Sequence, residues 1–445
     1  MHCDILIHDS AVLTKEFSIV QGQSIAIAGE NILKIGPAQE METLFTPKER
    51  ISGKGKLAMP GFIDGHTHTS QQLLRGMISD EYPVIYLRFN IPYESRLNED
   101  DVRLCTQLSC LEMIKSGITA FADAGGTYLP AMIEAVSGSG LRASITRATS
   151  DIGNGLPANM SCGSREALRL GEQLYREFDG TADGRIRIFF QIRSMTSCSS
   201  ELIRELAQAA REYDTGLHMH VSEYPESILK SLNEHGMREV EYLDSLGALC
   251  PNLLAAHCIL LSDNDVHLLA ARGVKVVHCP RSNLGKGITK TPQLLGLGVS
   301  VGLGSDGTAH SGLSMFKEIT AFKHAQIAAW GIPYADNAAM PARTLLEMAT
   351  LGSAKALRID AIAGTLEEGK KADLILLDVG RPHLQPTHNL LNSLMEAGES
   401  ADIMDMIVNG RVLMRDRRVL TLDEERLMQE GMGRIRRIAA DNGWA

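Results

Sequence analysis

Apolar and polar positions alternate at both ends of this 445-residue chain, and the alternation predicts short β-strands there. It runs through residues 4–57, as in Ser24-Ile25-Ala26-Ile27. Near the other end, residues 372–378 form an apolar run typical of a buried strand. Residues 405–413 have the pattern of a hairpin with Asn409-Gly410 at its turn. We therefore expect both chain ends to share one small sheet domain.

The middle of the chain has a different pattern, in which short apolar runs alternate with segments of helical spacing such as 201–213 and 264–272. Eight strands are expected there, ending near Asp64, Asp123, Arg147, Arg193, His220, His257, His278 and Asp306. Eight strands with helices between them predict a (β/α)8 barrel of the TIM type. A doubly wound sheet is the structural alternative, but it would gather its site at one switch point and not around a ring.

These patterns divide the chain into four parts. Residues 1–57 and 361–420 are expected to build the small sheet domain, and residues 58–360 the barrel. The last part, 421–445, contains a charged, helix-compatible segment at 423–440, which we interpret as a surface helix.

Composition adds limits on location and partners. No stretch approaches the roughly 20 uncharged apolar residues of a membrane span, and Met1-His2-Cys3-Asp4 begins a strand-like segment instead of a secretory leader. We expect a cytoplasmic protein without a membrane partner. The formal net charge of −10 works against binding to nucleic acid, whose phosphates it would repel. Eight cysteines without a C-x-x-C pair argue against a zinc ribbon, a redox motif or a disulfide scaffold.

The first candidate for chemistry is the pair His66 and His68. Positions two apart in a strand point to the same side, so both imidazoles are expected to face one point. Imidazole nitrogen is a common ligand of zinc-like metals. Alone, the pair is equally well read as two polar side chains at a strand end.

Ligand-type groups recur at the ends of later apolar runs, at His220, His257, His278 and Asp306. In a barrel of alternating strands and helices, the carboxyl ends of the strands assemble the active site. Residues far apart in the sequence are therefore expected to converge there.

Five motifs in this order resemble the amidohydrolase superfamily. They are Pro60-Gly61-Phe62-Ile63-Asp64-Gly65-His66-Thr67-His68, His220-Val221-Ser222-Glu223, Ala256-His257-Cys258, His278-Cys279-Pro280-Arg281-Ser282-Asn283 and Gly304-Ser305-Asp306-Gly307. Within the superfamily they are most similar to the aminohydrolase branch that includes S-adenosylhomocysteine and methylthioadenosine deaminases. The resemblance spans nearly the whole chain, and it implies that the end domain is a small β-sandwich.

The resemblance implies a set of site residues. One divalent metal, zinc or alternatively iron, would be held by His66, His68, His220 and Asp306. The bound ion would lower the pKa of a water molecule, Glu223 would carry its proton to the leaving amine, and His257 would polarise the water or the oxyanion. Asp306 is also expected to act as the first base. A two-metal site would need a bridging lysine or glutamate on the fourth strand, and residues 186–191 offer none.

The same resemblance places Glu94 and Arg147 on the substrate side of the site, with His278 as a supporting hydrogen bonder. Arg193 stands where the family has a histidine, and Arg281 where it has a small residue. With Lys286, the three arginines suggest a cationic cluster at the barrel mouth. That cluster predicts a carboxylate or phosphate on the substrate.

Each assignment has a simpler reading when it is taken alone. Asp306 could cap a helix, Glu223 and Glu94 could be solvated carboxylates, and Arg147 could be a solvated cation at a strand end. The complete set in the expected order favours the site over these separate readings.

The sequence therefore predicts a hydrolytic deaminase that releases ammonia from an adenosine-type nucleoside such as S-adenosylhomocysteine, methylthioadenosine or 5'-deoxyadenosine. The expected partners are this small molecule, water as co-substrate, and further copies of the chain in a homo-oligomer. Hydrolysis of another heterocycle, such as guanine, a pterin, a pyrimidine or a triazine, is the alternative within the enzyme class. A non-catalytic metal-binding barrel is the alternative outside it, but it would not need Glu223 and His257.

Overall fold

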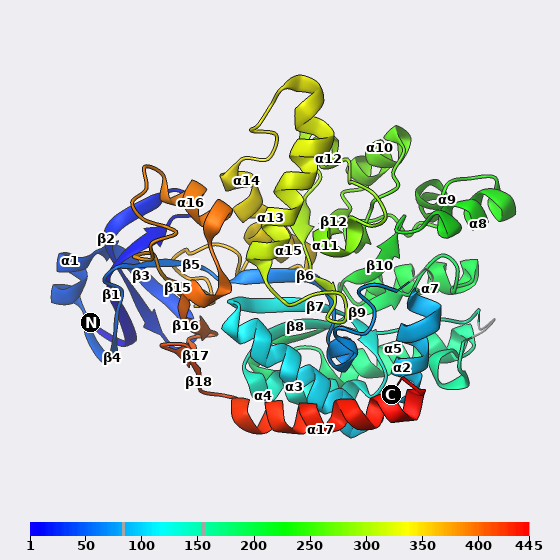
Figure 1. Cartoon of the computed structure of the whole chain (residues 1–445), viewed down its shortest axis with the longest axis horizontal. Helices are drawn as coiled ribbons and strands as arrows, with labels where there is room; N and C mark the ends of the chain where they lie inside the picture. The colour runs from blue at the N-terminus through cyan, green and yellow to red at the C-terminus, as the bar shows by residue number, and fades with distance from the viewer. Residues whose placement is uncertain (82–84, 153–155, 445) are drawn as a thin grey trace.

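The computed structural model describes residues 1–81, 85–152 and 156–444, and its strands belong to two nine-membered sheets (Figure 1). One sheet is built from the two ends of the chain and lies to the left in Figure 1. The other is a parallel sheet built from the middle of the chain and lies to the right. This arrangement confirms the prediction that both ends share one sheet.

The terminal sheet has the order β18-β17-β16-β15-β5-β1-β2-β3, with β4 paired to β1. Its strands are β1 (His2–Leu13), β2 (Ile19–Ala28), β3 (Asn31–Pro37), β4 (Thr46–Ser52), β5 (Lys56–Pro60), β15 (Leu374–Asp378), β16 (Ile403–Val408), β17 (Arg411–Arg415) and β18 (Arg418–Val419). Antiparallel pairing of β5 with β15 joins the two ends of the chain. Asn409 and Gly410 both have positive φ between β16 and β17, which is the two-residue hairpin that the sequence predicts.

The parallel sheet has the order β13-β12-β11-β10-β9-β8-β7-β6-β14. Its strands are β6 (Phe62–His68), β7 (Ile118–Gly126), β8 (Arg142–Arg147), β9 (Ile186–Ile192), β10 (Leu217–Val221), β11 (Leu253–His257), β12 (Lys275–His278), β13 (Val301–Leu303) and β14 (Asp306–Gly307). They end within a few residues of the predicted strand ends. Most are buried along their length, as their apolar sequences indicate.

The two outer members of this sheet are consecutive in the chain. β13 pairs with β12, and two residues later β14 pairs with β6 at the other edge. β13 also lies against β6. The sheet is therefore curled, and the carboxyl ends of β6, β10, β11 and β14 face a common region.

Helices alternate with these strands and cover the outside of the curled sheet (Figure 1). The helices of the described residues are α1 (Ala38–Leu44), α2 (Ile91–Arg96), α3 (Glu99–Lys115), α4 (Leu129–Ser139), α5 (Ser164–Phe178), α6 (Thr181–Gly184), α7 (Ser200–Glu212), α8 (Pro225–His235), α9 (Glu239–Ser245), α10 (Asp263–Ala271), α11 (Pro280–Asn283), α12 (Thr291–Gly296), α13 (Met315–Gln326), α14 (Ala342–Glu347), α15 (Ser353–Ala356), α16 (Leu390–Ala397) and α17 (Glu424–Asn442). Unlike the others, α1 packs against β1, β2 and β3 of the terminal sheet. α7 and α10 are the two helices that the sequence predicts at 201–213 and 264–272.

The last helix, α17, lies on the surface and packs one face against the helical layer. It runs along α3 in Figure 1, with Leu427 and Ile438 buried. Arg434 and Arg437 both pair with the buried carboxylate of Asp101 on α3. The surface helix that the sequence predicts is therefore confirmed, and one of its faces is tied to the helical layer.

Two further expectations can be compared with the fold. Among the described residues, every cysteine is free, and all but Cys162 are buried, as small apolar side chains usually are. No helix in the described part of the chain combines the length and apolar character of a membrane-spanning segment.

Candidate metal and catalytic centre

Three histidines and one aspartate meet at the carboxyl ends of three strands. His66 and His68 come from β6, His220 from β10 and Asp306 from β14. The Nε2 atoms of His68 and His220 lie 3.3 Å apart, and Oδ1 of Asp306 lies 3.5 Å from His66 Nε2 and 3.7 Å from His68 Nε2. The convergence that the sequence predicts is present in the structure. We call these four residues the ligand cluster.

The cluster has the chemistry of a cation site. Burial lowers the pKa of His68 and His220 well below the usual range, so both rings are neutral and have a free lone pair. Burial would raise the pKa of Asp306, but His66, His257 and Lys286 hold it well below its usual range. Nε2 of His66 is buried and has no hydrogen-bond partner among the described residues. These groups therefore fit a divalent ion that prefers nitrogen and oxygen ligands.

Neighbouring residues fix the orientation of each ligand. Nδ1 of His66 lies 2.8 Å from Nε2 of His218, and Nδ1 of His220 lies 3.0 Å from the carbonyl oxygen of Arg193. Ser282 donates a 2.5 Å hydrogen bond to Oδ2 of Asp306. Such contacts hold metal ligands in one rotamer. The sequence assigned no functional role to His218 or to Ser282.

Two buried carboxylates tie the strand ends together around the cluster. Asp64 accepts hydrogen bonds from the backbone N–H and the hydroxyl of Ser305, at 2.9 and 2.5 Å, and burial raises its pKa to about 6. Asp123 accepts from the backbone N–H and hydroxyl of Thr69 at 2.9 and 2.6 Å. These bonds tie Asp64 and Thr69, which lie on either side of His66 and His68, to the ends of neighbouring strands.

The backbone turns sharply where the functional side chains leave their strands. His257 has φ 73° and Asp306 has φ 62°, in the left-handed region that non-glycine residues rarely adopt. Gly304 is required nearby, because a Cβ at that position would lie 2.7 Å from the backbone nitrogen of His66. The strained turns and the close approach place Asp306 beside the β6 histidines.

Glu223 and His257 lie beside the ligand cluster. Their Oε2 and Nε2 atoms are 3.7 Å apart, and His257 Nε2 has no hydrogen-bond partner among the described residues. Lys286 donates to Glu223 Oε1 at 2.6 Å and to Ser282 Oγ at 3.1 Å. Burial would raise the pKa of Glu223, but the neighbouring His257 and Lys286 outweigh it and lower the pKa.

A small cavity of about 130 Å³ opens onto the cluster. Its lining includes His68, His220, Glu223, Asp306 and Arg193, and also Gln71, Tyr86, Asn90 and His310. The guanidinium of Arg193 lies over the Tyr86 ring, 5.0 Å from its centroid. We call this space the cluster cavity.

Glu94 and Arg147 line a second cavity of about 210 Å³. Gln71 links the two spaces, because it lines the cluster cavity and donates to Glu94 Oε1 at 2.7 Å. The structure thus places Glu94 and Arg147 in a neighbouring cavity and not among the residues that line the cluster cavity.

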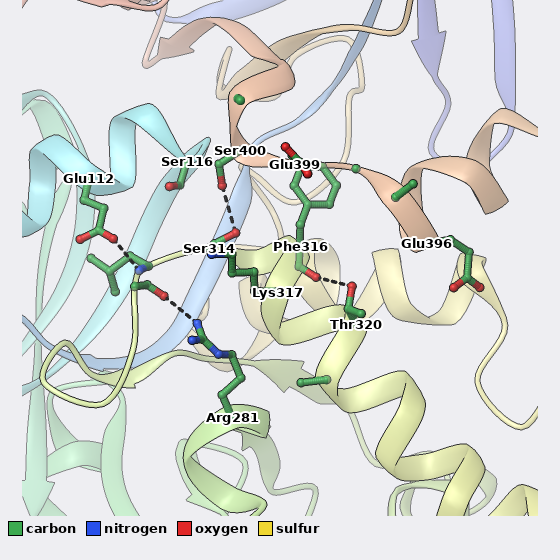
Figure 2. Close-up of a pocket in the computed structure, with 16 residues that line it drawn as sticks. Glu112, Ser116, Arg281, Ser314, Phe316, Lys317, Thr320, Glu396, Glu399 and Ser400 are labelled. Carbon is green, nitrogen blue, oxygen red and sulfur yellow. Dashed lines mark hydrogen bonds between the residues drawn. The ribbon is translucent and has the colours of Figure 1, made fainter. Parts of the chain in front are cut away.

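Arg281 lies elsewhere. Its side chain lines a larger cavity of about 790 Å³ between α13 and residues 396–401, and donates to the carbonyl oxygen of Gly312 at 3.3 Å (Figure 2). His278 does not line the cluster cavity either, since its ring bonds the His257 carbonyl oxygen at 2.8 Å and the Thr291 hydroxyl at 3.0 Å. The cationic cluster expected at one mouth is therefore divided among separate places.

Comparisons with known proteins agree with this geometry. A model of the amidohydrolase family matches residues 57–413. The chain is 38% identical to a 5-methylthioadenosine/S-adenosylhomocysteine deaminase of Pelotomaculum thermopropionicum, over 98% of this chain and 99% of that protein. It is 37% identical to a 5'-deoxyadenosine deaminase of Methanothermobacter thermautotrophicus, over 92% and 97%. A crystal structure of an adenosine deaminase from Xanthomonas campestris with bound zinc superimposes with a TM-score of 0.92 at 26% identity, covering 99% of each chain.

Proposed function

The chain belongs to the amidohydrolase family, and from this membership we propose that it is a hydrolytic deaminase that releases ammonia from an aminated N-heterocycle of the adenosine type. The observation that carries the proposal is that His66, His68, His220 and Asp306 meet at the carboxyl ends of three strands, with Glu223 and His257 beside them. The names of the two similar deaminases support the choice of an adenosine-type ring.

His66, His68, His220 and Asp306 would hold one divalent ion, with zinc preferred over iron. The donor set and the zinc in the Xanthomonas campestris deaminase support this assignment. When bound, such an ion acidifies a water molecule and so makes it a nucleophile at neutral pH. His218, Ser282 and the Arg193 carbonyl would keep the ligands in place.

Glu223 is the proposed proton carrier. As a carboxylate held ionised by Lys286, it takes a proton from the attacking water and delivers it to the leaving amine. A C–O bond forms at the ring carbon, the C–N bond breaks, and ammonia departs. Nε2 of His257, which bonds no other group in the described part of the chain, stabilises the oxygen that becomes negative. The Asn283 side chain, 3.0 Å from Nδ1, orients the His257 ring. Asp306 is the second candidate, besides Glu223, for the base that first takes the proton from the water.

The two neighbouring cavities suggest how a nucleoside would bind. The heterocycle would occupy the cluster cavity, and the remainder of the substrate would extend past Gln71 toward Glu94 and Arg147. His278 would act as a positioning residue through the His257 carbonyl. Arg281 has no role in this arrangement.

We further infer that the curled sheet is a (β/α)8 barrel in which β13 and β14 are two parts of the eighth strand. The terminal sheet would then be the small β-sandwich domain. Because β5 belongs to the terminal sheet through Pro60, we place the boundary between this sheet and the barrel at Gly61 instead of residue 57.

A cytoplasmic location and a homo-oligomer remain predictions of the sequence.

The direct test is metal analysis followed by an ammonia-release screen on the metal-loaded protein. We expect about one ion per chain and ammonia from at least one of adenosine, 5'-deoxyadenosine, methylthioadenosine and S-adenosylhomocysteine. Guanine, pterin, pyrimidine and triazine rings complete the screen and test the alternatives. If the loaded protein released no ammonia from any ring, the proposed function would be wrong.

A further inference from the structure

A short segment of the chain supplies residues to both cavities of the candidate site. It runs from residue 85 to residue 96 and consists mainly of a π-helix, η2 (Tyr86–Asn90), followed by α2. Tyr86 and Asn90 line the cluster cavity, and Glu94 lines the second cavity. Asn90 is buried, and its Oδ1 has no hydrogen-bond partner among the described residues. We call residues 85–96 the cavity segment.

The cavity segment is too short to hold its position by itself. Isolated helices of five or six residues are unstable in water, so the orientation of η2 and α2 depends on their contacts. On the inner side, the Tyr86 hydroxyl accepts from Arg193 Nε at 3.3 Å, and Glu94 accepts from Gln71 at 2.7 Å. On the outer side, α17 packs against α2 and ends beside it in Figure 1.

Trp444 has a fixed position at the end of α17. Gly443 ends the helix with φ 69°, a conformation that glycine adopts without strain. Its N–H donates to the Ala440 carbonyl oxygen at 3.1 Å, and the N–H of Trp444 donates to the Ala439 carbonyl oxygen at 2.9 Å. This pair of bonds is a Schellman motif, which fixes the direction of the chain after a helix. Two arginines that pair with Asp101 hold the helix itself on α3.

From this position Trp444 packs on the cavity segment. The centroids of the Trp444 and Phe89 rings lie 5.8 Å apart, with the ring planes at 47°. Phe89 is buried and directly precedes Asn90 in η2. A second contact joins the same two elements, because Arg96 donates a hydrogen bond from Nη1 to Oδ1 of Asn442. The end of α17 therefore holds the cavity segment at two points.

We propose that Trp444 is a positioning residue for the deamination reaction, although it is absent from the described lining of both cavities. Tyr86 and Asn90 flank Phe89 on one helical turn, so the contact between Phe89 and Trp444 fixes the direction in which both side chains point into the cluster cavity. The segment is then ordered before a nucleoside binds, and no binding energy is lost in ordering it. The inference rests on the proposed deaminase function and adds to its site a residue from the end of α17.

The first test measures nucleoside affinity on metal-loaded Glu223→Gln protein, in which turnover does not interfere. The probes are adenosine, 5'-deoxyadenosine, methylthioadenosine and S-adenosylhomocysteine. In this background, Trp444→Ala should weaken the tightest-binding probe about tenfold, because the variant must order the cavity segment when the probe binds. Trp444→Phe keeps an aromatic ring and should stay within about threefold of the parent. Equal affinities for Trp444→Ala and its parent, or no binding of any probe, would overturn the inference.

The matched control is Met432→Ala, which removes a large apolar side chain from the same helix at a position that is 60% exposed. It should leave the affinity unchanged. A loss equal to that of Trp444→Ala would show that any change in α17 disturbs the protein, and the inference would be wrong.

A second test uses the partner ring. In the same background, Phe89→Leu should weaken the same probe by a similar factor. Adding Trp444→Ala to Phe89→Leu should weaken it less than about twofold further, because the ring contact is already lost. Fully additive effects would show that the two rings do not act together, and this result would contradict the inference.

Kinetics distinguish positioning from a general loss of structure. With Glu223 intact, Trp444→Ala should raise KM about tenfold and change kcat less than about threefold, because the ligand cluster and the proton carrier are untouched. The metal content should equal that of the wild type. A fall in kcat or in metal content with an unchanged KM would mean that Trp444 has a structural role only, and the inference would fail.

Turnover separates this inference from the proposed function. Ammonia release by Trp444→Ala with the KM of the wild type would overturn the inference and support the function. Weaker probe binding by Trp444→Ala, without ammonia release from any ring by loaded wild-type protein, would support the inferred positioning and contradict the function.

Discussion

Two cavities of this molecule differ in size and in how their polar groups are satisfied. The larger, of about 790 Å³, lies over α13 (Figure 2). Two of the carboxylates that line it are paired within the protein: Glu112 accepts from the Leu313 N–H and pairs with Arg75, and Glu396 pairs with Lys323. The cluster cavity, of about 130 Å³, is lined or flanked by buried atoms of His66, Gln71 and His257 that have no hydrogen-bond partner within residues 1–81, 85–152 and 156–444. Unused hydrogen-bonding capacity, and not volume, therefore marks the site that awaits a ligand.

Substitutions in the two cavities should differ most in their effect on activity when a metal ligand is removed. His66→Ala should lose the bound ion and reduce ammonia release at least about 10⁴-fold, because the nucleophilic water depends on the metal. Lys317→Ala, at an exposed lysine of the larger cavity, should change activity less than about twofold. Metal content and kcat/KM of both variants check this. Equal effects would contradict the distinction between the cavities.

Removing the proton carrier should separate chemistry from metal binding. Glu223→Gln keeps the shape of the side chain and should reduce kcat by about 10²–10⁴-fold. Because Glu223 is not among the proposed ligands, the metal content should stay at the wild-type value. A variant that lost its metal would show instead that Glu223 belongs to the ligand set.

The residues behind the ligands should have smaller effects. His218→Leu removes the 2.8 Å contact to His66 Nδ1, and the affinity for the ion should fall about 10–100-fold. At saturating metal, kcat should recover to within a few-fold of wild type. Equilibrium titration with a competing chelator measures the affinity. An unchanged affinity would mean that the His66 ring is held by packing alone.

The smallest effect should be a shift in pH dependence. Lys286 lowers the pKa of Glu223, which must be ionised to take a proton, so activity is present above that pKa and is lost as pH falls through it. Lys286→Met should therefore raise the pKa and move the acidic limb of the kcat/KM profile to higher pH. A limb that stayed in place or moved down would show that Lys286 does not tune Glu223.

The positions of the ligands could be predicted from sequence because they follow from local rules. Strand periodicity places His66 and His68 on one side, and parallel strands bring His220 and Asp306 to the same end. The direction of the Arg281 side chain could not be predicted. It lies one residue before Ser282, which bonds Asp306, yet it points into another cavity because α11 turns between them.

The contacts of Lys286 and Gln71 also depend on loops whose path periodicity does not describe. Gln71 follows His68 by three residues in a short 3-10 helix, Thr69–Leu74, and this turn carries its amide back toward Glu94. Lys286 reaches Glu223 from the segment after α11. The spacing His-x-x-Gln after the histidine pair was the available sequence signal for Gln71, but its meaning required the neighbouring side chains.

The central claim is that His66, His68, His220 and Asp306 bind one divalent ion. Anomalous X-ray diffraction from crystals of the zinc-loaded protein, measured on both sides of the zinc absorption edge, tests it most directly. The account predicts a single strong peak, bound by the three imidazoles and the carboxylate at about 2.0–2.2 Å. A peak bound by other residues, two peaks within the cluster, or no peak there would contradict it.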